Sequence, residues 1–144
     1  MTKTFKTSKQ EMKSLQIILN NVFNACRKNN WLYIERNRER LNVDRLCSKD
    51  FKGNSPLYIA VANKHMDTVK YLIERGVPIE QRNEGGNTAM HKAFMNQDLD
   101  MIQYLYEVGG SYKTANEFNQ TPLYFGSKRV LEKLGVSNYP VTIN

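Results

Sequence analysis

The sequence predicts an all-α solenoid, and a segment that occurs three times is the main observation behind this prediction. Residues 53–60, 86–93 and 119–126 read GNSPLYIA, GNTAMHKA and NQTPLYFG, and each copy starts 33 residues after the one before. A fixed period of roughly 20 to 50 residues indicates a repeat architecture. Each copy also has a residue that can cap a helix start, namely Ser55, Thr88 or Thr121. Two copies follow it with proline, which the first helical turn tolerates, so each copy is expected to begin a helix.

The period and the Thr-Pro-Leu-His-x-Ala pattern resemble the ankyrin repeat. The resemblance covers roughly residues 22–136 and is most specific between residues 53 and 123. It implies stacked helix-turn-helix units with hairpin fingers, and a binding face made by finger tips and inner helices. The positions that match the family's caps, core and turns are Ser55, Pro56, Leu57, Ala60, Gly76, Gly86, Thr88, His91, Ala93, Gly109, Thr121, Pro122 and Leu123.

These patterns divide the chain into three parts. We expect a flexible basic arm at residues 1–8, a repeat domain at 9–136 and an extended tail at 137–144. Repeat 1 covers about residues 20–52, repeat 2 covers 53–85, repeat 3 covers 86–118, and a shortened repeat 4 covers 119–136. A short closing unit is typical of the end of a solenoid.

The N-terminal helix is expected over roughly residues 9–29, because apolar residues recur there at three- and four-residue steps. It is longer than one ankyrin inner helix, so its first half should project beyond the stack, where it either caps the core or docks on a partner. A paired helix is expected from Trp31 to about Leu41. About two extra residues then predict a looser loop near residues 43–48.

The later helices follow from the period. They are expected at about residues 55–63, 67–75, 88–96, 100–107 and 121–126, with a helical stub at 129–134. Lys64 and Gln97 stand where the family usually has glycine, so either these turns differ or both residues take positive φ. Asn119 replaces a finger glycine and tolerates a left-handed conformation. The tail either lies back on the last helices or adds to a neighbour as a strand.

The positive charge is concentrated in the first third of the chain. The formal net charge is +7, and residues 1–52 hold twelve Lys and Arg against five Asp and Glu, whereas the remaining residues are balanced. This asymmetry predicts that a basic end meets an acidic surface. The residues proposed to bind a partner are Lys3, Lys6, Lys9, Lys13, Arg27, Lys28, Arg36, Arg38 and Arg40, with Phe51, Lys52 and Phe118 at finger tips and Tyr139 in the tail.

Sequence motifs for catalysis, cofactors and metals are missing. The chain has no phosphate-binding loop, no Cys/His metal spacing and no nucleophile elbow. His65 and His91 are expected to be architectural, and Asp98 and Asp100 to cap a helix. The sequence has no apolar run of about 20 residues that could span a membrane and no secretory signal. Its two cysteines suit a reducing compartment. No enzyme activity, cofactor or small-molecule substrate is expected.

The expected function is protein–protein interaction. We expect a small adaptor of a larger cytoplasmic or cytoskeletal assembly, and an acidic filament such as a microtubule or a ciliary axoneme fits the charge. The alternative is a nucleic-acid- or ribosome-associated protein that places the same basic residues on phosphates. Phe51 and Phe118 either pack on the adjacent finger or contact a partner.

Overall fold

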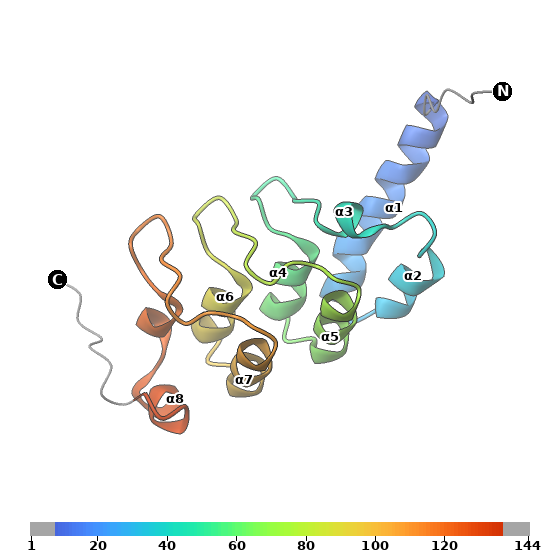
Figure 1. The fold of residues 1–144 in the computed structure, drawn as a ribbon. Helices are drawn as coiled ribbons and strands as arrows, with labels where there is room; N and C mark the ends of the chain where they lie inside the picture. Colours follow the sequence, from blue (N-terminus) through green and yellow to red (C-terminus); the bar gives the residue numbers. More distant parts are fainter. Residues whose placement is uncertain (1–7, 137–144) are drawn as a thin grey trace.

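The computed structural model describes residues 8–136 as a row of helix pairs with loops projecting from one side (Figure 1). All regular structure in this part is helical. The loops are called finger 1 (residues 47–55), finger 2 (75–88) and finger 3 (108–121). The expected tail, most of the expected basic arm, and the candidate residues Lys3, Lys6 and Tyr139 lie outside the described residues.

Helix α1 (Lys9–Arg27) is the long N-terminal helix that the apolar period predicts. It starts with a capping box in which Ser8 and Glu11 each accept a hydrogen bond from the other's backbone amide, both at 3.1 Å. Its first half projects beyond the row (Figure 1), and Met12 and Ile17 there are each 60% exposed. Its second half buries Val22 and packs against α4 (Pro56–Ala62). The second half of α1 therefore caps the core, whereas the first half does not.

Repeat 1 differs from the prediction in two places. Helix α2 (Trp31–Arg36) ends well before Leu41, since the side chain of Asn37 donates to the carbonyl of Tyr33 at 2.8 Å and stops the helix. The expected loose loop contains a short helix instead, α3 (Val43–Leu46). Asn42 caps α3 by accepting from the amide of Arg45 at 2.9 Å, and Leu46 is fully buried. The extra residues thus form a helical turn that adds to the core.

Repeats 2 and 3 confirm the predicted helices to within one or two residues. They are α4, α5 (Met66–Glu74), α6 (Ala89–Met95) and α7 (Leu99–Glu107). Ser55 and Thr88 cap α4 and α6 by accepting backbone amides at 3.2 and 3.4 Å. Lys64 and Gln97 take φ of 61° and 53°, so the left-handed alternative for these turns is the correct one.

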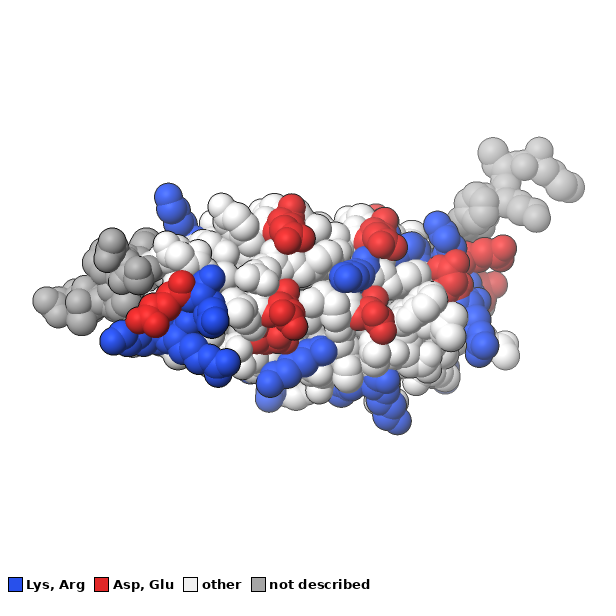
Figure 2. All heavy atoms as spheres, turned by 90° about the horizontal axis from the view of Figure 1, so that it is seen from below, with Lys and Arg blue, Asp and Glu red and all other residues white. Residues whose placement is uncertain are grey.

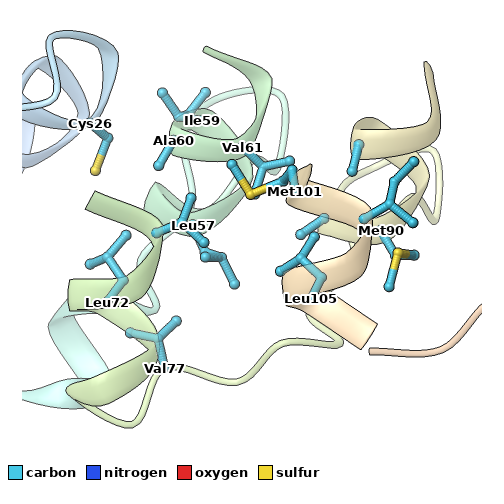
Figure 3. Close-up of a cluster of buried hydrophobic side chains, with 14 of the residues drawn as sticks. Cys26, Leu57, Ile59, Ala60, Val61, Leu72, Val77, Met90, Met101 and Leu105 are labelled. Atoms are coloured by element: carbon cyan, nitrogen blue, oxygen red, sulfur yellow. The ribbon is translucent and has the colours of Figure 1, made fainter. Parts of the chain in front are cut away.

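The core runs without interruption between the helices of successive units. Leu57, Leu72, Met90 and Leu105 are almost completely buried and lie along this core (Figure 3). Cys26 is also buried and contributes from the N-terminal end, and burial raises the pKa of its thiol to about 12. Cys26 therefore behaves as a small hydrophobic residue.

The closing unit consists of the 3₁₀ helix η1 (Pro122–Phe125) and α8 (Lys128–Lys133), in place of the α-helix predicted at 121–126. The expected cap at Thr121 is wrong, because its hydroxyl is buried without a hydrogen-bond partner in the described structure. The equivalent hydroxyl of Thr88 lies 2.9 Å from Nδ1 of His91. Tyr124 replaces that histidine and offers no ring nitrogen, so Thr121 loses this partner. Among residues 8–136, no helix is both long and apolar enough to cross a membrane.

Candidate partner-binding surface

Each finger tip is shaped by one polar side chain at a repeated position. Asp50, Asn83 and Asn116 are spaced 33 residues apart. Each one accepts hydrogen bonds, at 2.9 or 3.0 Å, from the backbone amides two and four residues ahead. A side chain that holds its own loop in this way fixes a tight turn. The tips are therefore rigid features of the surface.

Neighbouring fingers are also bonded to one another. The side chain of Asn83 donates to Asn54 at 3.0 Å, and one repeat later Asn116 donates to Asn87 at 2.9 Å. Backbone bonds run in parallel with these, from Glu84 to Lys52 at 3.3 Å and from Glu117 to Gly85 at 3.0 Å. Two basic side chains span the same gaps: Lys49 donates to the carbonyl of Arg82 at 2.7 Å, and Arg82 to that of Ala115 at 3.0 Å. The three fingers thus form one continuous surface.

This bonding pattern was not predicted, although its signal is present in the sequence. The spacing of Asp50, Asn83 and Asn116 equals the repeat period, and so does the spacing of Lys49 and Arg82. Their roles depend on fingers lying within hydrogen-bond reach, which is a property of the stacked units.

Phe51 and Phe118 are presented to solvent at the tips of fingers 1 and 3. Their side chains are 85% and 76% exposed, so the alternative in which they pack on the adjacent finger is wrong. The Nζ atom of Lys52 lies 5.7 Å from the centroid of the Phe51 ring. Exposed aromatic residues on a rigid support are suited to act as anchors for a partner.

The basic candidates of the first third are exposed but spread along two helices and a turn. Lys9, Lys13, Arg27, Lys28, Arg36, Arg38 and Arg40 all have exposed side chains. About 21 Å of helix separates Lys13 from Arg27, so the structure does not gather all seven into one cluster. Arg40 donates to Ser14 at 3.2 Å and thereby joins the first half of α1, whereas Arg38 forms an ion pair with Glu35 at 3.3 Å.

A second basic region was missed by the sequence reasoning. Helix α8 carries Lys128, Arg129 and Lys133, all exposed, against one acidic residue, Glu132. Residues 53–144 hold equal numbers of basic and acidic residues, so their net charge does not reveal the local excess of positive charge in α8. Figure 2 shows Lys and Arg side chains gathered near the C-terminal end of the row, with acidic side chains in the middle of the same face.

The two histidines hold loops and helices together. The backbone amide of Thr88 donates to Nδ1 of His91 at 3.0 Å, so Nε2 carries the proton and donates to the carbonyl of Gln120 at 3.0 Å. Burial lowers the pKa of His91 and favours its neutral form. Nε2 of His65 lies 2.8 Å from the carbonyl of Arg27. Asp98 caps α7 by accepting from the amide of Met101 at 3.4 Å, and Asp100 lies in the first turn.

Comparison with known proteins agrees with this architecture. Residues 22–117 match the family model for ankyrin repeats in three copies. A search of curated proteins gave no significant match. The matched segment extends from the second half of α1 into finger 3 and makes up well over half of the chain. The chain therefore belongs to the ankyrin-repeat family, whose repeats are protein–protein interaction modules.

Proposed function

We propose that this protein is a small, non-catalytic adaptor subunit of a larger cytoplasmic or cytoskeletal assembly, with its basic first third docked on an acidic partner. The proposal rests mainly on finger 1. This loop is part of the continuous surface that the three fingers form, and its first residues also belong to the basic first third of the chain. At its tip, Phe51 is almost fully exposed and has Lys52 beside it. An aromatic anchor next to a cation suits a partner surface that has apolar hollows and acidic surroundings.

The proposed partner is an acidic filament or a large complex. Microtubules, including those of a ciliary axoneme, have the required charge, and the exposed bases of α1 and α2 would face it. Complementary charge mainly raises the rate and specificity of association. Because the bases lie at the surface, added salt should weaken the complex.

Co-sedimentation with purified microtubules tests this proposal. One variant reverses Lys9, Lys13 and Arg40 to Glu, and the matched control reverses Lys128, Arg129 and Lys133 to Glu, so both change the charge equally. Three exposed ion pairs at about 0.5 kcal/mol each predict a loss of affinity of about tenfold for the first variant. The control should bind almost as well as the unmodified chain. Equal losses in both variants would indicate unspecific attraction and would contradict the proposal.

Binding to nucleic acid is the second candidate, because the same exposed bases could contact phosphates. It predicts retention of bulk RNA that falls steeply with salt. Suppose that the unmodified protein retains RNA, that the Lys9, Lys13 and Arg40 variant does not, and that neither of the two binds microtubules. Nucleic acid then replaces the acidic filament as the proposed partner. If RNA is not retained at low salt, that candidate is excluded.

A further inference from the structure

Helices α2 and α5 lie away from the finger tips (Figure 1), and side chains of both line a groove. It has a volume of about 410 Å³ and is lined by Trp31, Asp67, Lys70, Tyr71 and Glu74; we call it the Trp31 groove. The rings of Trp31 and Tyr71 pack with their centroids 5.4 Å apart and an interplanar angle of 32°. Asp67 and Glu74 have exposed side chains. The groove therefore combines an aromatic wall with two carboxylates and one ammonium group, that of Lys70.

Tyr71 is held in place by groups outside the groove. Its hydroxyl donates to the carboxylate of Glu35 and accepts from Arg75 at 3.0 Å. The guanidinium of Arg75 also donates to the carbonyl of Leu41 and lies 5.8 Å from the Tyr71 ring centroid. Arg75 is thus bonded on the protein side, and the aromatic wall is ordered before any ligand arrives. Such preorganisation lowers the entropic cost of binding.

The next repeat shows how a cation fits this kind of site. Tyr104 follows Tyr71 by 33 residues, and the Nζ atom of Lys70 lies 5.4 Å from the Tyr104 ring centroid. Burial, followed by the negative charges of Glu74 and Glu107, raises the pKa of Tyr104, so both carboxylates lie near this ring. Between α5 and α7, the protein therefore places its own ammonium group over an aromatic ring with carboxylates nearby.

The Trp31 groove has a different residue at the position of that lysine. The fifth residue after the N-cap is Glu35 in α2, whose N-cap is Asn30. In α5, whose N-cap is His65, the fifth residue after it is Lys70. The first repeat thus supplies an anion where the second supplies a cation. Among residues 8–136, the cation–ring contacts involve Phe51, Tyr71 and Tyr104, and none involves Trp31.

We propose that the Trp31 groove binds an arginine or lysine side chain from a basic segment of a partner protein. The cation lies against Trp31, between the carboxylates of Asp67 and Glu74. The two carboxylates of the lining outnumber the single ammonium group of Lys70, which favours a cation, and tryptophan is the best aromatic partner for a cation. This goes beyond the proposed function, because the partner segment here is basic whereas the partner of the first third is acidic. The protein would then join two partners of opposite charge.

Fluorescence tests the proposal directly, because Trp31 is the only tryptophan in the chain. Tri-arginine amide is titrated into the full-length protein, and tri-glutamate serves as the control peptide. Tri-arginine should cause a saturable change in Trp31 emission that weakens with salt, and tri-glutamate should cause none. Asp67→Asn and Glu74→Gln should each lower the affinity about two- to fivefold, as expected for exposed charge pairs. Their repeat-matched controls, Asp100→Asn and Glu107→Gln, should leave the affinity unchanged.

A third variant tests the aromatic contribution. Trp31→Met introduces the residue type that the next repeat has at this position, Met66. Binding is then followed by NMR shifts of the α5 amides, and the affinity should fall about two- to fivefold as the cation–ring contact is lost. The proposal is overturned if tri-arginine gives no saturable response up to about 10 mM, if the control variants lose as much affinity as Asp67→Asn and Glu74→Gln, or if Trp31→Met binds normally. The proposal is also overturned if the free chain sediments as a dimer and tri-arginine dissociates that dimer. The groove would then bind a second copy of the chain.

Discussion

Gly86→Ala tests the contact between fingers 2 and 3. Gly86 is buried and has a φ of +76°, a conformation that favours glycine. A Cβ atom there would lie 2.8 Å from the backbone nitrogen of Glu117 and 3.2 Å from Cα of Asn116. Cβ atoms in folded proteins essentially never lie within 3.0 Å of a non-bonded atom such as the nitrogen of Glu117. The substitution must therefore push finger 3 away from finger 2.

The expected loss of stability has three parts. The left-handed conformation costs a residue with a side chain about 1–2 kcal/mol. Relieving the overlap costs about 1–3 kcal/mol, as overpacking does. The bond from the amide of Glu117 to the carbonyl of Gly85, 3.0 Å long, contributes about 1 kcal/mol when it is lost. Gly86→Ala should thus lower the free energy of unfolding by about 3–6 kcal/mol, a large part of the total for one domain.

Gly135→Ala provides the matched control. Its φ is +75°, but a Cβ atom there would have no neighbour within 4 Å. It should cost only about 1–2 kcal/mol, the conformational part alone. Urea denaturation followed by circular dichroism measures both variants. Equal losses would mean that the fingers do not approach each other as closely as described.

Two further predictions concern the core and its histidine. Leu72→Ala and Leu105→Ala should each lower the free energy of unfolding by about 2–5 kcal/mol because both side chains are completely buried, whereas Lys13→Ala should stay within about 0.5 kcal/mol; similar urea midpoints for all three would contradict the repeat register. Burial lowers the pKa of His91 in the folded state below its unfolded value of about 6.5. The unfolded chain therefore binds the proton more tightly, and the stability contributed by neutral His91 is complete above about pH 6.5 and falls as the pH drops toward the folded pKa. The decrease in stability from about pH 6.5 to 5 should be smaller in His91→Gln than in the unmodified protein, and an unchanged decrease would show that His91 is not the group responsible.

The repeat period predicted much of the fold because its signals are local. Ser55 and Thr88 start helices within their own segments, so α4 and α6 begin where the sequence indicates. The same reasoning failed at Thr121, because residues 122–125 form a 3₁₀ turn in which the amide of Tyr124 donates to the backbone carbonyl of Thr121 and not to its hydroxyl. It also failed at α3, whose capping residue Asn42 is not at a repeat position.

The surfaces were harder to predict than the helices. Phe51 and Phe118 could be placed at finger tips from the period, but their exposure depends on the contacts between fingers. The Trp31 groove brings together Trp31 and Tyr71, which lie 40 positions apart in the sequence. No sequence pattern around either residue predicts a binding site, because the groove exists only where α2 and α5 pack together.

Cross-linking mass spectrometry in native extract tests the central claim, that the basic first third docks on an acidic protein partner. The proposal predicts cross-links from Lys9, Lys13, Lys28 and Lys52 to acidic proteins of one assembly. All four side chains are exposed and can react. Cross-links to partners only from Lys128 and Lys133, with none from these four lysines, would contradict it.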